Sequence, residues 1–244
     1  MDTFKRIGFS IGDTVKLLWL HRSSESKINP KELHEAYESL FPGRKVSYDY
    51  VARIAKRLES QGYLIMSQVQ NKKYYSITAS GKEHLQQYES LYYSKFVELL
   101  KVIDRIHFNL TKDGQKPEQP EYPLPQEFRS YFAKLISVKD ITRYMIFTLG
   151  MNRTEFYAAE VVNQLNMLYG WSPSNGYLYE ITREMEAEGT IEGRWREPEK
   201  RTVRLIHVTD AGEVFAKQVT NNLREQIINV RKYLKSFVVF FGKT

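Results

Sequence analysis

The chain has 244 residues, 36 Lys and Arg against 29 Asp and Glu, a formal net charge of +7, and no cysteine. The lack of cysteine excludes disulfides and thiolate metal sites, and the moderate basic excess allows a nucleic-acid partner without requiring one. Residues 14–20 are interrupted by Lys16 and residues 237–241 are too few to cross a bilayer, so we expect a cytoplasmic protein.

Residues 14–77 predict three helices followed by a β-hairpin. The first helix is indicated by residues 14–20, and the second by Pro30 at its start and Pro42-Gly43 at its end. Ser47 caps the third helix and Gly62 ends it. This order is that of a winged helix-turn-helix, in which the third helix is the recognition helix.

The recognition helix is predicted to be amphipathic, with charged side chains opposite its buried face. The buried positions recur at helical spacing. The buried face is formed by Val51, Ile54, Ala55 and Leu58, and the opposite face by Tyr48, Ala52, Arg53 and Lys56.

Residues 63–68 and 73–77 alternate like paired strands around Asn71-Lys72, a turn sequence with a positive tip. They predict the wing.

The same pattern returns 127 residues later, which indicates a tandem duplication. Each copy continues from its hairpin into Thr-x-x-Gly, at residues 78–81 and 209–212. Residues at the constant offset are Asp13 and Asp140, Gly43 and Gly170, Ser47 and Ser174, Tyr50 and Tyr177, Ile54 and Ile181, Lys56 and Arg183, Glu59 and Glu186, and Gly62 and Gly189.

The second copy is expected to have helices at residues 141–148, 157–168 and 174–188, and strands on either side of residues 196–201. Its wing is four residues longer than the first. We therefore expect a mainly α fold with small β-wings (α+β), built from two tandem winged helix-turn-helix domains.

Each copy also continues into a long helix whose apolar residues recur mostly every three or four positions, the spacing of a coiled-coil seam. Such a stripe needs a partner, so dimerisation is implied, either within one chain or between two. The seam residues are Tyr92, Phe96, Leu99, Ile103 and Ile106 in the first copy and Leu223, Ile227, Val230, Leu234 and Phe237 in the second.

Residues 111–125 carry four of the eight prolines and predict a linker. The expected domains are therefore residues 1–110, a first winged-helix unit with its long helix, and residues 126–244, a second such unit.

Basic and polar side chains surround both predicted recognition helices and both wings. In a winged helix the recognition helix meets base edges and the wing meets phosphate. Their placement in both copies favours DNA contact over an ordinary solvated surface. The candidate DNA-binding residues are Lys45, Ser47, Tyr48, Arg53, Lys56, Arg57, Lys72 and Lys73 in the first copy, and Ser172, Ser174, Asn175, Tyr179, Arg183, Arg194, Arg196, Lys200, Arg201 and Arg204 in the second.

The second recognition helix also carries Glu180, Glu184, Glu186 and Glu188, which would repel phosphate if they faced it. Its specificity is therefore expected to differ from that of the first.

The second copy resembles the PadR family of bacterial transcriptional regulators. The resemblance lies in residues 173–179, Arg183, residues 185–186 and 188–189, Trp195, and residues 200–201 and 209–212. The first copy resembles the family less closely, with Asp49 and Ala52 where Gly and Tyr are usual. The second has Glu180 where Pro is frequent, and Leu205-Ile206 where a Tyr pair is usual.

The resemblance implies a repressor-like protein that binds double-stranded DNA, associates with the bacterial nucleoid when bound, and dimerises through its C-terminal helices. Two units in one chain imply an intramolecular pseudo-dimer that reads two unequal half-sites about one helical turn, roughly 34 Å, apart. A homodimer with four wings is the alternative.

Tyr88, Tyr92, Tyr93 and Phe96 could line a pocket for a small aromatic effector, or simply pack the seam. Catalysis is not expected, because the five histidines are scattered and neither a phosphate-binding glycine loop nor Gly-x-Ser-x-Gly occurs. No metal or cofactor is expected.

Two other functions stay open. Tandem winged helices also serve plasmid or phage replication and partition, with the same physical contacts to DNA. Alternatively, winged helices dock other proteins in an interaction scaffold, which the glutamates of the second recognition helix would suit.

Overall fold

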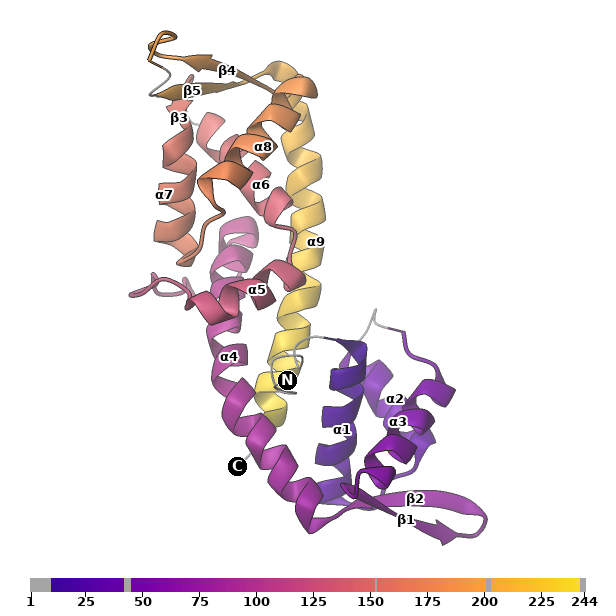
Figure 1. The fold of residues 1–244 in the computed structure, drawn as a ribbon. Coiled ribbons are helices and arrows are strands. Elements are labelled where there is room, and N and C mark those ends of the chain that lie inside the picture. The colour runs from indigo at the N-terminus through magenta and orange to yellow at the C-terminus, as the bar shows by residue number, and fades with distance from the viewer. Residues whose placement is uncertain (1–9, 42–44, 152, 201–202, 242–244) are drawn as a thin grey trace. The chain divides into compact units, whose positions relative to one another are not determined.

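The computed structural model describes residues 10–41, 45–151, 153–200 and 203–241, which form a mainly helical protein with two small β-sheets (Figure 1). The chain forms two compact units. Unit 1 contains Met1–Val97 and Lys232–Thr244, and unit 2 contains Glu98–Arg231. No helix of the described residues is both long and apolar enough to span a membrane.

Unit 1 begins with three helices, each started by a polar cap. Ser10, Asn29 and Ser47 accept hydrogen bonds from the first free backbone N–H groups of their helices. The helices are α1 (Ile11–Glu25), α2 (Pro30–Leu40) and α3 (Tyr48–Ser60). The predicted starts at Pro30 and after Ser47 are confirmed, whereas the predicted stop at Pro42-Gly43 lies outside the described residues.

A hairpin follows α3, formed by β1 (Leu64–Val69) and β2 (Lys72–Ile77). Val69 pairs with Lys72, so the turn residues are Gln70 and Asn71, with φ of 45° and 63°. A two-residue hairpin turn of this kind needs positive φ at both positions, which Asn tolerates well. The prediction of a turn at Asn71-Lys72 was therefore wrong by one residue.

The core of unit 1 is closed by the end of α9, the last helix of the chain. Trp19 is fully buried, and its indole Nε1 donates to the backbone oxygen of Val51 at 3.0 Å. From α9, the hydroxyl of Tyr233 lies 3.0 Å from that of Thr14, and the ring of Phe237 stacks on that of Phe96 at 4.6 Å. The predicted seam residues Phe96 and Phe237 thus belong to this core.

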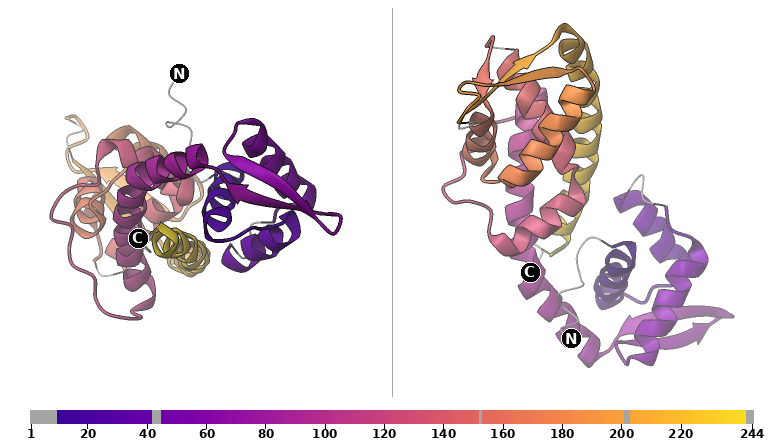
Figure 2. Two further views of the ribbon diagram at one scale, coloured as in Figure 1. Left: turned by 90° about the horizontal axis from the view of Figure 1, so that it is seen from below. Right: turned by 45° about the horizontal axis from the view of Figure 1, so that its top comes forward.

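Unit 2 contains α6 (Val138–Gly150), α7 (Ala158–Tyr169) and α8 (Asn175–Ala187), followed by β4 (Ile191–Trp195) and β5 (Arg204–Val208). These elements confirm the predicted order of the second copy. Two further elements were not predicted, α5 (Gln126–Leu135) and the short strand β3 (Phe156–Tyr157), which pairs with β5 to give the sheet order β3-β5-β4 (Figure 2).

The proline-rich residues 112–125 contain no helix or strand, but they pack against other parts of unit 2. The Nε of Arg105 donates to the oxygen of Glu118 at 2.8 Å, and the N–H of Leu124 donates to the oxygen of Gly170 at 2.7 Å. A cavity of about 880 Å³ lies between this segment and α4. The segment therefore forms part of unit 2 rather than lying free of it.

The long helices α4 (Ala79–Thr111) and α9 (Asp210–Phe241) pack together within the chain. In unit 2, the Nε of Arg231 donates to Asp104 at 2.5 Å and the guanidinium of Arg224 donates to the oxygen of Leu110 at 3.2 Å. The later residue of α4 contacts the earlier residue of α9, so the two helices run antiparallel. All ten predicted seam residues are buried.

Matching local contacts occur where each recognition helix leads into its hairpin. The hydroxyl of Thr78 donates to the oxygen of Gly62 at 2.6 Å, and that of Thr209 donates to the oxygen of Gly189 at 2.7 Å. Both glycines have positive φ, 77° and 70°. A tandem duplication would produce such pairs, and so would independent selection of the same helix stop.

Candidate nucleic-acid interface

The recognition helix of unit 1 is α3, and its buried face agrees with the predicted one. Val51, Ile54, Ala55 and Leu58 are at most 2 % exposed. Ser47 caps the helix by accepting from the N–H of Tyr50 at 3.2 Å. The spacing of apolar residues therefore turns the opposite face of α3 outward.

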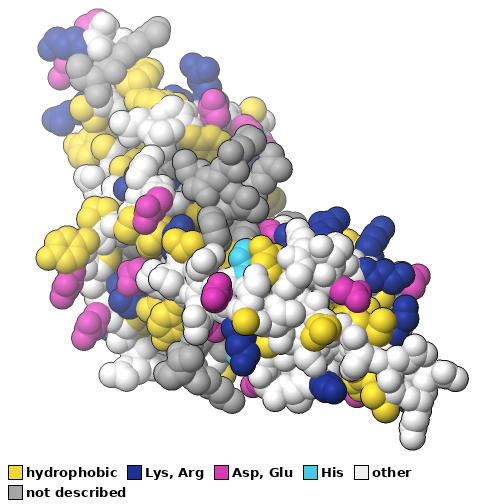
Figure 3. All heavy atoms as spheres, turned by 60° about the horizontal axis from the view of Figure 1, so that its bottom comes forward, with side chains coloured by type: hydrophobic (Ala, Val, Ile, Leu, Met, Phe, Trp, Pro, Cys, Tyr) yellow, Lys and Arg dark blue, Asp and Glu magenta, His cyan; other side chains and the backbone are white. Residues whose placement is uncertain are grey.

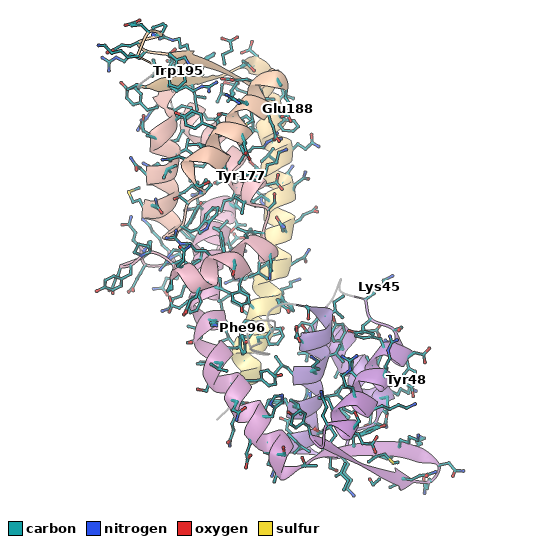
Figure 4. The ribbon with its side chains drawn as sticks, viewed as in Figure 1. Lys45, Tyr48, Phe96, Tyr177, Glu188 and Trp195 are labelled. Atoms are coloured by element: carbon teal, nitrogen blue, oxygen red, sulfur yellow. The ribbon has the colours of Figure 1, made fainter. Side chains whose placement is uncertain are left out.

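The outward face and surroundings of α3 expose every predicted cation of unit 1. Tyr48 is 49 % exposed at the start of the helix, with Lys45 in the segment before it (Figure 4). The ion pairs that the described residues of unit 1 form use other cations, such as Lys16, Arg22 and Lys31. Figure 3 shows Lys and Arg side chains on the surface of this unit. The exposed cations are Lys45, Arg53, Lys56, Arg57, Lys72 and Lys73.

Tyr50 positions one of these cations. The guanidinium carbon of Arg53 lies 5.3 Å from the centre of the Tyr50 ring, a cation–π contact. The tyrosine hydroxyl lies so close to α1 that a Cβ added to Gly12 would be 2.8 Å from it. Tyr50 therefore connects the start of α1 to the recognition helix, a role that its sequence position left open.

The wing of unit 1 adds apolar surface that was not predicted. Ile65 is 61 % exposed and Val69 is 49 % exposed, and both lie on the same face of β1, four residues apart. Lys72 lies directly opposite Val69 at the tip. The wing therefore presents lysine beside aliphatic side chains, and the β-alternation of residues 65 and 69 was the signal that could have shown it.

The recognition helix of unit 2, α8, has the same local frame. Ser174 accepts from the N–H of Tyr177 at 3.2 Å, and Leu178, Ile181 and Met185 are buried. The predicted contact residues Asn175, Tyr179 and Arg183 are exposed, while Ser172 is half-buried just before the helix.

Glutamates of α8 are bound to cations of unit 2. Lys139 from α6 contacts Glu184 at 2.5 Å, and Arg143 contacts Glu188 at 2.7 Å. The hydrogen bond from Lys139 holds the pKa of Glu184 below its usual range, so this carboxylate is ionised. The pairs tie α8 to α6 and offset the negative charge that would repel phosphate. Glu180 is exposed and takes part in no ion pair within the described chain.

A second ion pair joins α8 to the hairpin. The guanidinium of Arg204 donates to both carboxylate oxygens of Glu186 at 2.5 Å, and it lies 5.6 Å from the ring centre of Trp195. Only 12 % of the Arg204 side chain is exposed. A Cβ added to Gly193 would meet the carboxylate of Glu186 and the guanidinium of Arg204, so a larger residue there would shift this ion pair. Arg204, a predicted DNA contact, is thus held inside a local network.

The wing of unit 2 also has internal partners for its cations. Arg194 donates to both oxygens of Glu155 at 2.8 and 2.7 Å, which lowers the pKa of that carboxyl. Arg196 donates weakly to the Tyr157 hydroxyl at 3.4 Å. Lys200, which is exposed, pairs with a glutamate three residues away. Arg201 lies outside the described residues.

Three of the four aromatic residues considered for an effector pocket are buried against other rings. Tyr88 contacts His84 and Tyr92, and Phe96 stacks on Phe237. Tyr93 is 39 % exposed. These contacts are those of a packed seam, and an effector stays a prediction.

Three helices with a β-hairpin after the third define a winged helix, and unit 1 and unit 2 each contain one. An exposed cationic helix beside a lysine-tipped hairpin can bind a polyanion through phosphate contacts and base edges. The chain therefore has the architecture of a winged-helix protein.

Residues 149–218 match the transcriptional regulator PadR-like family. This segment runs from the end of α6 through the hairpin into α9. Among solved structures, the chain is similar to Bacillus subtilis PadR in complex with operator DNA, with 14 % identity and a TM-score of 0.29 over 93 % of this chain and 97 % of that one. No curated protein matches the chain.

Proposed function

We propose that the protein is a sequence-specific transcriptional regulator that binds double-stranded DNA and acts as a repressor. The observation that carries the proposal is the exposed, cationic recognition helix α3, whose Arg53, Lys56 and Arg57 have no ion-pair partner within the described chain. The PadR-like match at residues 149–218 supports it independently, because it lies in the other winged helix.

In this proposal the two winged helices come from a duplication and read unequal half-sites of one operator. The constant 127-residue offset and the shared cap and stop residues support the duplication. The proposed boundaries are residues 1–110 and 126–244, with residues 111–125 between them. All predicted DNA-binding residues remain proposals, and the protein is expected to work in the cytoplasm without catalysis.

Selection of bound duplexes from a random library tests DNA binding, half-site symmetry and spacing together. The expected result is an enriched site with two related but unequal halves, and promoter binding that lowers transcription of a reporter. Enrichment of one half-site alone would contradict two-site reading. Failure to enrich any duplex at low salt would contradict DNA binding itself.

A protein-interaction scaffold is the second candidate, favoured by exposed acidic residues of α8. The helix Asn175–Ala187 exposes Glu180 and Glu184 beside Arg183. A basic protein partner would suit such a surface. Stable binding of a protein partner by a chain that binds no duplex would favour the scaffold over the regulator.

A further inference from the structure

The ion pair between Asp104 and Arg231 joins positions that are equivalent in the repeat. The two residues are separated by 127 positions, the offset of the duplication. Two antiparallel helices related by a local twofold axis bring equivalent residues together only at that axis. Asp104 and Arg231 therefore mark the axis of the α4–α9 seam.

A second set of contacts, one in each unit, involves residues at the same offset. Asn109 on α4 donates to the hydroxyl of Tyr169, the last residue of α7, at 3.1 Å. Ser236 on α9 donates to the oxygen of Leu40, the last residue of α2, at 3.2 Å. Asn109 and Ser236 are again 127 positions apart. Each long helix thus makes a polar contact with the end of the second helix of the opposite copy.

Opposite charges at an axis position can exist only between non-identical helices. If α4 paired with α4 of another chain in the same register, Asp104 would face Asp104, and a pair of α9 helices would place Arg231 against Arg231. Like charges in contact are repulsive, whereas α4 with α9 places a carboxylate against a guanidinium.

From this geometry we propose that Asp104 and Arg231 are pairing-specificity residues that select α4–α9 pairing within one chain and disfavour α4–α4 and α9–α9 pairing between chains. The inference rests on the proposed duplication and deepens it, because it commits the chain to a pseudo-dimer built from one molecule. Covalent linkage adds to the same preference by giving the two helices an effective concentration in the millimolar range.

Charge exchange in the full-length protein tests the role of the pair. Asp104→Arg and Arg231→Asp should each lower the melting temperature by roughly 3–6 °C, because each replaces the ion pair by a like-charge contact. Their combination should recover most of the loss. A matched control, Glu98→Arg combined with Arg231→Asp, changes the same charge on α4 and should recover nothing. Additive losses in the exchanged protein would overturn the proposal.

Crosslinking tests whether the pairing is within one chain. The protein has no cysteine, so Asp104→Cys with Arg231→Cys introduces two defined sites for a short bis-maleimide. We expect a crosslinked monomer whose yield is independent of protein concentration, and no crosslinked dimer from either single variant. Dimers from the double variant would instead show exchange of helices between chains, and dimers from a single variant would show like-with-like pairing. Either result would overturn the proposal.

These variants lie outside α3, α8 and both hairpins. A protein that paired as expected but bound no DNA would contradict the proposed function alone. A protein that bound DNA but paired like with like would contradict this inference alone.

Discussion

The helices α3 and α8 share one local frame and differ in surface charge. Both begin after a serine cap and end before a glycine with positive φ. At the exposed positions, Arg53 and Arg57 of α3 correspond to Glu180 and Glu184 of α8 at the 127-residue offset. The comparison shows that burial constrains one face of such a helix, while the exposed face can carry either sign of charge in the same local fold.

Acidic residues in α8 and at its C-cap have cationic partners in α6. Glu184 and Glu188 contact Lys139 and Arg143, whereas the corresponding positions in α1 are Gly12 and Lys16. Arg143 is only 7 % exposed in its side chain. These glutamates of unit 2 are therefore part of an internal network, whereas Arg53, Lys56 and Arg57 of α3 form no ion pair within the described residues.

The largest expected effect separates the two helices by their contribution to DNA binding. Arg53→Ala with Lys56→Ala should weaken specific binding about 10- to 100-fold, because both side chains are exposed and available for base and phosphate contacts. Asn175→Ala with Arg183→Ala should weaken it less, by roughly 3- to 10-fold, because the neighbouring Glu180, which is exposed and forms no ion pair within the described residues, opposes phosphate. Fluorescence anisotropy with the selected duplex measures both.

The control for that comparison is Lys101→Ala with Lys235→Ala, which removes two exposed positive charges from the long helices. It should change affinity by less than about twofold. Equal losses for the α3 and α8 variants would show that the glutamates of α8 do not limit its contact with DNA.

A second prediction distinguishes two roles for Arg204: stabilising the fold through its ion pair with Glu186, or contacting DNA directly. Arg204→Gln should lower the free energy of unfolding by about 1–3 kcal/mol, since it leaves the partly buried Glu186 without its cation. Denaturant unfolding followed by circular dichroism measures this loss. Adding Glu186→Gln should restore part of the stability. An unchanged stability with weaker DNA binding would instead identify Arg204 as a direct contact.

Sequence patterns predicted the elements that depend on neighbouring residues. The periodicity of Val51, Ile54 and Leu58 placed the buried face of α3, and Ser47 and Gly62 placed its ends. These features are local, because helix caps and helical spacing involve residues within a few positions.

Contacts between residues that are distant in the sequence could not be predicted from local sequence patterns. Arg204 pairs with Glu186, which is 18 residues away in the sequence, and Arg194 pairs with Glu155, which is 39 residues away. Nothing in the local sequence distinguishes these arginines from solvated wing residues. The helix α5 had a signal in Phe128, Phe132 and Leu135, but it follows Pro125 without a side-chain cap and was obscured by the proline-rich segment.

A third prediction compares the two wings through the salt dependence of DNA binding. Lys72→Gln with Lys73→Gln should weaken all duplexes alike, by about three- to tenfold, and reduce the slope of log affinity against log salt by roughly 1 for each lost phosphate contact. Arg194→Gln should change the slope less, because its guanidinium is bound to Glu155. An equal change of slope would show that DNA displaces the glutamate.

The smallest expected effect concerns a histidine of unit 1 whose matching position in unit 2 holds a residue that does not titrate. His84 stacks on Tyr63 at 4.2 Å, and Phe215 occupies the matching position after the Thr-x-x-Gly of unit 2. Burial lowers the pKa of His84 below its usual range. Between the folded and unfolded pKa values the unfolded chain binds more protons, so this residue should make the protein less stable as pH falls below about 6.5.

His84→Phe copies the residue of unit 2 and keeps an aromatic ring against Tyr63. It should remove the part of the pH dependence due to this histidine while changing stability at pH 8 by less than about 1 kcal/mol. Thermal unfolding of both proteins between pH 8 and pH 5.5 measures the difference. Because protonation of His84 acts only on the folded core of unit 1, the melting curves should converge at high pH and separate at low pH, with the variant the more stable. Curves that stay parallel over this range would show that the histidine is protonated equally in the folded and unfolded states.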